Sequence, residues 1–220
     1  MQPNYEAAAA AAMHLLIENN VIATPIDSLS ILLSRPGVRV MTFSEMATET
    51  GTDRDDLVPL FGKNQDAVTF KLPQPIDGID YVVVYNRFLL MDVVSRGIAR
   101  ELGHIIMGHD GQTRPAEVRK AEALCFAHHL LSPRPVIRLL QESDIRITLD
   151  VLAETTGCSS DCVEGLQAIP GVHVPKEINQ QVKKQFENEI LEYVRFRSAS
   201  HKKDTSPEID FGSFMDNYED

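Results

Sequence analysis

Residues 100–109 read Arg-Glu-Leu-Gly-His-Ile-Ile-Met-Gly-His, and this stretch gives the clearest indication of the fold. Glu101 and His104 are three residues apart, so on a helix they lie on one face about one turn apart. With a histidine in front of the glutamate, the pattern would supply two zinc-binding imidazoles and a carboxylate beside the metal-bound water. Here that position is Arg100, and a guanidinium has no lone pair for a metal. The stretch predicts a degenerate zinc-peptidase helix.

A second helical stretch, 116–131, carries further candidate residues. Glu122 comes early in it, where its carboxylate can face the first helix across an antiparallel pair and complete a metal site. Cys125 and His129 follow Glu122 by three and seven residues, so all three share a helical face. His109 stands just beyond the first helix. His109, Cys125 and His129 are therefore candidate replacement ligands or supporting residues.

Together these two stretches resemble the ImmA/IrrE family of zincin-like metallo-endopeptidases. The family pattern is His-Glu-Leu-Gly-His followed by a Leu-Gly-His tail, and then Glu-Ala-Asn-x-Phe-Ala-x-x-Leu-Leu-x-Pro. Residues 120–133 read Lys-Ala-Glu-Ala-Leu-Cys-Phe-Ala-His-His-Leu-Leu-Ser-Pro, so Leu124 stands where the family prefers Asn. The resemblance extends over about residues 5–170, because the order of the expected elements upstream is also similar.

The resemblance implies a zinc-dependent endopeptidase that cleaves a helix-turn-helix transcriptional repressor, often one encoded beside it on a mobile element. In that case Glu101 is the general base, and His104 and Glu122 are zinc ligands. The strands expected at 67–72 and 81–85 offer an edge that an extended substrate would pair with.

Arg100 leaves two interpretations open. In one, the site is zinc-free, and Arg100 occupies the place of the metal and bridges to Glu122 or Glu101. The chain is then a pseudopeptidase that binds a repressor or another protein without cutting it. In the other, Arg100 swings away, a replacement ligand completes the zinc site, and the enzyme is active.

The order of elements predicts an α+β fold, with helices packed on a small antiparallel sheet. We expect one zincin-like domain at 1–198, with a core at about 5–170 and a C-terminal helical extension at 171–198, followed by a disordered acidic tail at 199–220. The predicted strands are 38–43, 67–72 and 81–85; the predicted helices are 5–20, one capped by Thr24, 44–51, 89–108, 116–131, 149–156, 160–169 and one from Pro175.

Composition and charge argue against several classes of function. The net charge of −11 disfavours nucleic acid as a partner, because such binding depends on Lys and Arg that neutralise phosphates. Residues 149–169 have helix-turn-helix spacing, but their second helix carries two acids and no base, which favours packing over DNA binding. No apolar run is long enough to span a membrane. Three cysteines, with Cys158 and Cys162 expected as ordinary thiols, point to a reducing, cytoplasmic location.

Overall fold

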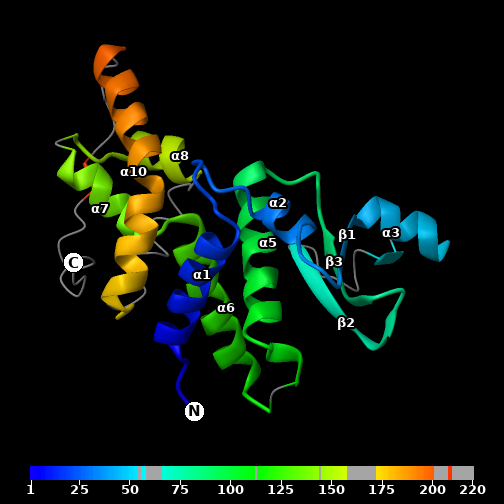
Figure 1. Ribbon diagram of the computed structural model, residues 1–220. Coiled ribbons are helices and arrows are strands. Elements are labelled where there is room, and N and C mark those ends of the chain that lie inside the picture. The colour runs from blue at the N-terminus through cyan, green and yellow to red at the C-terminus, as the bar shows by residue number, and fades with distance from the viewer. Residues whose placement is uncertain are drawn as a thin grey trace. The chain divides into compact units, whose positions relative to one another are not determined.

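The computed structural model describes residues 1–53, 56–57, 66–111, 113–143, 145–157, 172–200 and 208–209. These residues form an α+β structure of helices and one three-stranded sheet, as predicted (Figure 1). The chain divides into two compact units. The first unit contains Asp27–Ala123, and the second contains Gln2–Ile26 and Leu124–Asp220, so the boundary falls inside one helix, α6.

The sheet of the first unit has the order β1-β3-β2. Its strands are β1 (Val38–Thr42), β2 (Ala67–Ile76) and β3 (Ile79–Tyr85). β2 and β3 form an antiparallel hairpin around Asp77 and Gly78, both of which have positive φ, as an Asp-Gly hairpin turn requires. β1, however, pairs with β3 in parallel, so the prediction of an antiparallel sheet is wrong for this pair. The reason is that β1 and β3 are not consecutive, and the chain passes through α3 and β2 between them.

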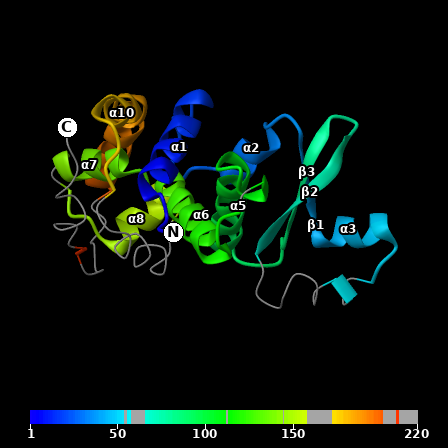
Figure 2. The same ribbon diagram turned by 90° about the horizontal axis from the view of Figure 1, so that it is seen from below.

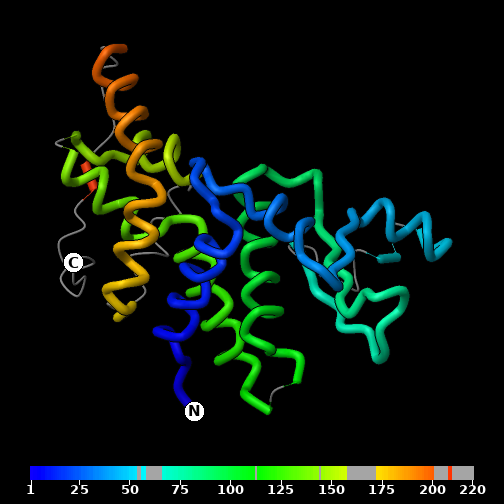
Figure 3. The backbone as a smooth tube through the Cα atoms, in the orientation of Figure 1, coloured from blue at the N-terminus to red at the C-terminus, as the bar shows by residue number. Residues whose placement is uncertain are grey.

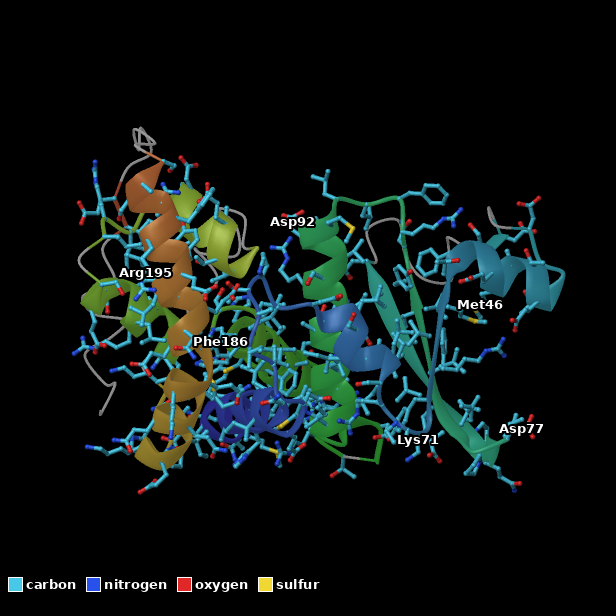
Figure 4. The ribbon with its side chains drawn as sticks, turned by 45° about the horizontal axis from the view of Figure 1, so that its top comes forward. Met46, Lys71, Asp77, Asp92, Phe186 and Arg195 are labelled. Carbon is cyan, nitrogen blue, oxygen red and sulfur yellow. The ribbon has the colours of Figure 1, made fainter. Side chains whose placement is uncertain are left out.

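Helices cover both faces of this sheet. α3 (Phe43–Thr50) packs against β1 and β3, where Met41, Phe43 and Val84 form an apolar cluster. α5 (Met91–Ile106) contacts β2 and β3, and α2 (Ser28–Leu33) contacts α5 and β1. Figure 2 shows α3 on one side of the strands and α2 and α5 on the other. Figure 4 marks Met46 on α3 and Asp77 at the hairpin turn.

Local chemistry sets two of the helix starts. α3 begins with a capping box, in which the Thr42 hydroxyl accepts from the amide of Glu45 and the Glu45 carboxylate accepts from the amide of Thr42. α2 is capped by Asp27, whose carboxylate accepts from the amides of Leu29 and Ser30. The prediction of Thr24 as the cap is therefore wrong, because the helix begins at Ser28 and Asp27 is its N-cap.

The second unit is helical. It contains α1 (Tyr5–Glu18), α7 (Arg134–Glu142), α8 (Leu149–Thr156), α10 (Lys176–Ala199) and the later part of α6 (Ala116–Leu131). α10 packs against α7 and α1 with Phe186, labelled in Figure 4, fully buried; the tube in Figure 3 follows these helices. Within the described ranges, no helix combines the length and apolar character that a membrane crossing requires.

Candidate functional site

Arg100 lies on α5 in the first unit, and three groups hold its guanidinium. Its Nη2 donates to Asp66 Oδ1 at 2.8 Å, to the carbonyl oxygen of Ala67 at 3.1 Å and to Glu101 Oε1 at 3.1 Å. The nearby carboxylates of Asp66 and Glu101 outweigh the cost of burial and raise the pKa of Arg100, so the side chain is a fixed cation. Arg100 thus connects the motif helix to the start of β2.

Backbone hydrogen bonds and close packing on α5 hold Asp66 in place. Its Oδ1 accepts from the amide of Ala67 at 2.9 Å, and its carbonyl oxygen accepts from the amide of Asn86 at 2.8 Å. Its side chain lies directly on Gly97 of α5: a Cβ atom at position 97 would stand 2.5 Å from Asp66 Cγ. Gly97 is one turn before Arg100, so the missing side chain at 97 makes room for the acid that the cation at 100 binds.

Glu101, the expected general base, is buried, with 6% of its surface exposed. Burial raises its pKa, and the Arg100 guanidinium opposes that effect. The zinc-free interpretation predicted a bridge from Arg100 to Glu101 or Glu122; the structure has the bridge to Glu101 and adds Asp66, while Glu122 binds other groups.

Glu122, His109 and His104 form a hydrogen-bonded chain beside this cluster. His104 Nδ1 lies 2.9 Å from His109 Nδ1, and His109 Nε2 lies 3.0 Å from Glu122 Oε2. The other Glu122 oxygen, Oε1, accepts from Arg114 Nη1 at 2.6 Å. Glu122 and His109 are buried, with 0% and 1% of their surface exposed, and Arg119 donates to the carbonyl of His109.

The hydrogen bonds determine the tautomers of the two imidazoles. A carboxylate only accepts, so His109 Nε2 carries a proton and donates to Glu122. A neutral His109 then has its lone pair at Nδ1 and accepts from His104 Nδ1–H. Burial lowers the pKa of both, that of His104 to about 4, so both imidazoles are neutral near pH 7. The lone pair of His104 is consequently at Nε2, which is the form that a metal-binding histidine takes.

The arrangement does not fit a catalytic zinc site, which needs three protein ligands and an open position. Both oxygens of Glu122 and both ring nitrogens of His109 form hydrogen bonds with protein groups. Glu101 Oε1 accepts a hydrogen bond from Arg100. In the parts of the chain that the structure describes, no three or more His, Cys, Asp or Glu side chains are arranged to hold a metal ion.

Cys125 and His129 point into the second unit. Both are buried, and His129 Nδ1 donates to the carbonyl of Cys125 at 2.9 Å. The Cys125 thiol lies 3.6 Å from the carbonyl oxygen of Tyr5 on α1 and 3.6 Å from His129 Nδ1. The shared helical face predicted for Glu122, Cys125 and His129 therefore places the last two in packing contacts.

Sequence reasoning missed Asp66, Gly97 and Arg114. Only Gly97, one turn before Arg100, carried a local signal, because a glycine inside a helix often marks a close approach. Asp66 and Arg114 belong to other segments, and nothing in their neighbourhood indicates their partners. Cys158, Cys162 and the helix predicted at 160–169 lie outside the described residues.

A comparison of the chain with protein families, with curated proteins and with solved structures finds no match.

Proposed function

We propose that this chain is a zinc-free, zincin-like relative of the ImmA/IrrE peptidases that binds a protein partner, such as a helix-turn-helix repressor, without cutting it. The observation that carries this proposal is the fixation of Arg100 by Asp66, Ala67 and Glu101. A side chain held by several groups inside its own unit, with a glycine that makes room for the principal partner, is not poised to swing out for a metal.

The cation takes over part of the electrostatic role of a metal. Two carboxylates close together repel each other, and a positive charge between them removes much of that cost. Arg100 provides one positive charge and a planar set of donors to Asp66 and Glu101. The site is therefore stable without an ion, and the motif helix and β2 stay joined.

The edge of β2 is the surface that we assign to the partner. β2 is an outer strand of the sheet, and Asp66 turns its carbonyl towards β3. Backbone groups alternate along a strand, so Val68 and Phe70 also face β3, whereas Thr69 and Lys71 direct theirs outward. An extended peptide can pair with these outward groups by strand addition. Lys71, labelled in Figure 4, is exposed and forms an ion pair with Asp110.

A second candidate function, the zinc endopeptidase predicted from the sequence, keeps one observation in its favour. His104, His109 and Glu122 lie in one hydrogen-bonded chain, and His104 presents an unprotonated Nε2. Zinc in the purified protein at one ion per chain would support this candidate. Substituting His109, Cys125 and His129 in turn would then identify the replacement ligand by loss of metal.

The metal content of the full chain, purified without added zinc, tests the proposal. We expect well below one zinc ion per chain. The double substitution Arg100→His with Asp66→Asn removes the cation and its buried counter-charge together and adds an imidazole four residues before His104. This variant should gain zinc, and any peptidase activity that appears should be abolished by Glu101→Gln. Stoichiometric zinc in the wild type would reject the zinc-free proposal.

A matched pair of substitutions at the edge of β2 tests the binding of the partner. Thr69→Pro removes an outward amide that strand addition needs, whereas Thr69→Val keeps it. A repressor bound by the wild-type chain should remain intact over hours. Thr69→Pro should abolish the binding, whereas Thr69→Val should preserve it. Cleavage of the repressor, or equal binding by both variants, would contradict this part of the proposal.

A further inference from the structure

A two-residue piece of the C-terminal segment pairs with the chain just before α8. Glu208 forms an antiparallel β-bridge with Thr148, and the amide of Ile209 donates to the carbonyl of Ile147 at 2.9 Å. Arg146 Nε lies 3.1 Å from Glu208 Oε2. The three contacts involve consecutive residues on both sides, which is the pattern of a short added strand and not of a single chance contact.

The residues that receive this strand are suited to it. Ile147 and Thr148 are β-branched, which favours an extended backbone, and both are buried. Arg146 is exposed and supplies the charge that matches Glu208. The edge therefore selects an extended segment in which an acidic residue precedes an apolar, β-branched one, as Glu208 and Ile209 do.

Thr148 also connects this edge to α8. Its hydroxyl accepts from the amide of Val151, so Thr148 is the cap of the helix. A strand paired at Thr148 thus fixes the residue that starts α8. Releasing the strand frees the backbone at the beginning of that helix.

We propose that residues 146–148 are a strand-docking site and that the chain occupies it with its own Glu208 and Ile209 as a displaceable latch on α8. Because the segment belongs to the same chain, a weak pairing is populated through its high local concentration. The same weakness lets a competing strand displace it. The latch uses none of the residues around Arg100, so it stands independently of the proposed function.

Hydrogen exchange in the full chain tests the latch. The Ile209 amide should exchange more slowly than in an unstructured peptide. Arg146→Glu should speed that exchange by about threefold or more, because an exposed ion pair is lost and a repulsion replaces it. The rate of hydrogen exchange at the Val151 amide should increase in the same variant. Arg146→Glu combined with Glu208→Arg should restore the protection of both amides.

Two controls make the result specific. Arg138→Glu makes the same charge change at an exposed arginine of α7, whose ion pair is with Glu142, and should leave the Ile209 amide protected. Ile209→Pro removes the amide donor and should speed hydrogen exchange at the Val151 amide, whereas Ile209→Val keeps the donor and should leave that exchange unchanged. The proposal is overturned if Ile209 exchanges at the unstructured rate, if Arg146→Glu has no effect, or if the protection rises with protein concentration, which would assign the strand to a second copy.

Discussion

At the scale of single residues, the character of the site follows from what stands at positions 66, 97 and 100. Arg100 is a half-buried cation, which is costly unless carboxylates and hydrogen bonds surround it. Asp66 supplies the principal compensation, and it reaches Arg100 only because residue 97 has no side chain. Because the three residues contact one another, we expect the effects of substituting them on the free energy of unfolding to be coupled.

Gly97→Ala should therefore destabilise the protein, against the usual trend. Alanine in place of a helical glycine normally stabilises by about 0.5–1 kcal/mol. Here the new Cβ would stand 2.5 Å from Asp66 Cγ, so we expect a loss of about 1–3 kcal/mol in the free energy of unfolding, measured by urea denaturation. Gly111→Ala, with nothing within 4 Å of its new Cβ, is the control and should change little.

A double-mutant cycle shows whether the clash is with Asp66. In the Asp66→Gly background both the carboxyl group and the Cβ atom of residue 66, which would stand 2.5 Å and 2.8 Å from the new Cβ at position 97, are gone. Gly97→Ala should therefore cost much less there than it does in the wild type. An equal cost in both backgrounds would refute the close packing of Asp66 on Gly97.

At the scale of elements, apolar periodicity predicted the two long helices around the site, whereas the cap predicted at Thr24 was wrong. The helices expected at 89–108 and 116–131 appear as α5 at Met91–Ile106 and α6 at Ala116–Leu131. α7 was missed because Pro133 and Pro135 read as a helix stop, whereas Pro133 is the N-cap and Pro135 lies in the first turn. The parallel pairing of β1 with β3 and the Arg100–Asp66 pair join segments far apart in the sequence, and neither leaves a periodic trace.

α6 carries a pH-sensitive residue in its buried part. Burial lowers the pKa of His129 to about 3, and the nearby Arg134 adds to the effect. An unfolded chain binds a proton at this histidine below about pH 6.5, while the folded chain does not until about pH 3. The unfolded state is therefore favoured as the pH falls through that window, and the free energy of unfolding decreases.

His129→Asn should remove part of this dependence. An asparagine keeps an N–H donor for the Cys125 carbonyl and does not titrate. Between pH 7 and pH 5 the wild type should lose about 1–2 kcal/mol more stability than the variant, measured by urea denaturation at each pH. His14→Asn, at an exposed position of α1, should leave the pH dependence of the wild type unchanged. Parallel curves for the wild type and His129→Asn would contradict the buried, neutral histidine.

At the scale of the whole molecule, the net charge of −11 leads us to expect that the chain does not bind nucleic acid. A duplex repels an acidic protein unless basic residues gather on one face, and binding that rests on such residues weakens steeply with salt. Residues 149–169 have helix-turn-helix spacing in the sequence, and α8 covers Leu149–Thr156 of that segment. The stretch at 160–169 contains Asp161 and Glu164 and no Lys or Arg, so it lacks the groups that contact phosphates.

The full chain should consequently show no salt-dependent binding to duplex DNA in fluorescence anisotropy at 50 mM and 200 mM salt. Replacing Asp161 and Glu164 by lysine gives the stretch a basic character and should produce weak binding at the lower salt concentration, which the higher one abolishes. This variant shows that the assay detects the interaction that the native charge prevents. Tight binding by the wild type that falls steeply between the two salt concentrations would contradict the prediction. The chain would then have to concentrate some of its 21 lysine and arginine side chains on one face against its overall charge, and DNA would replace a protein as the partner to be sought.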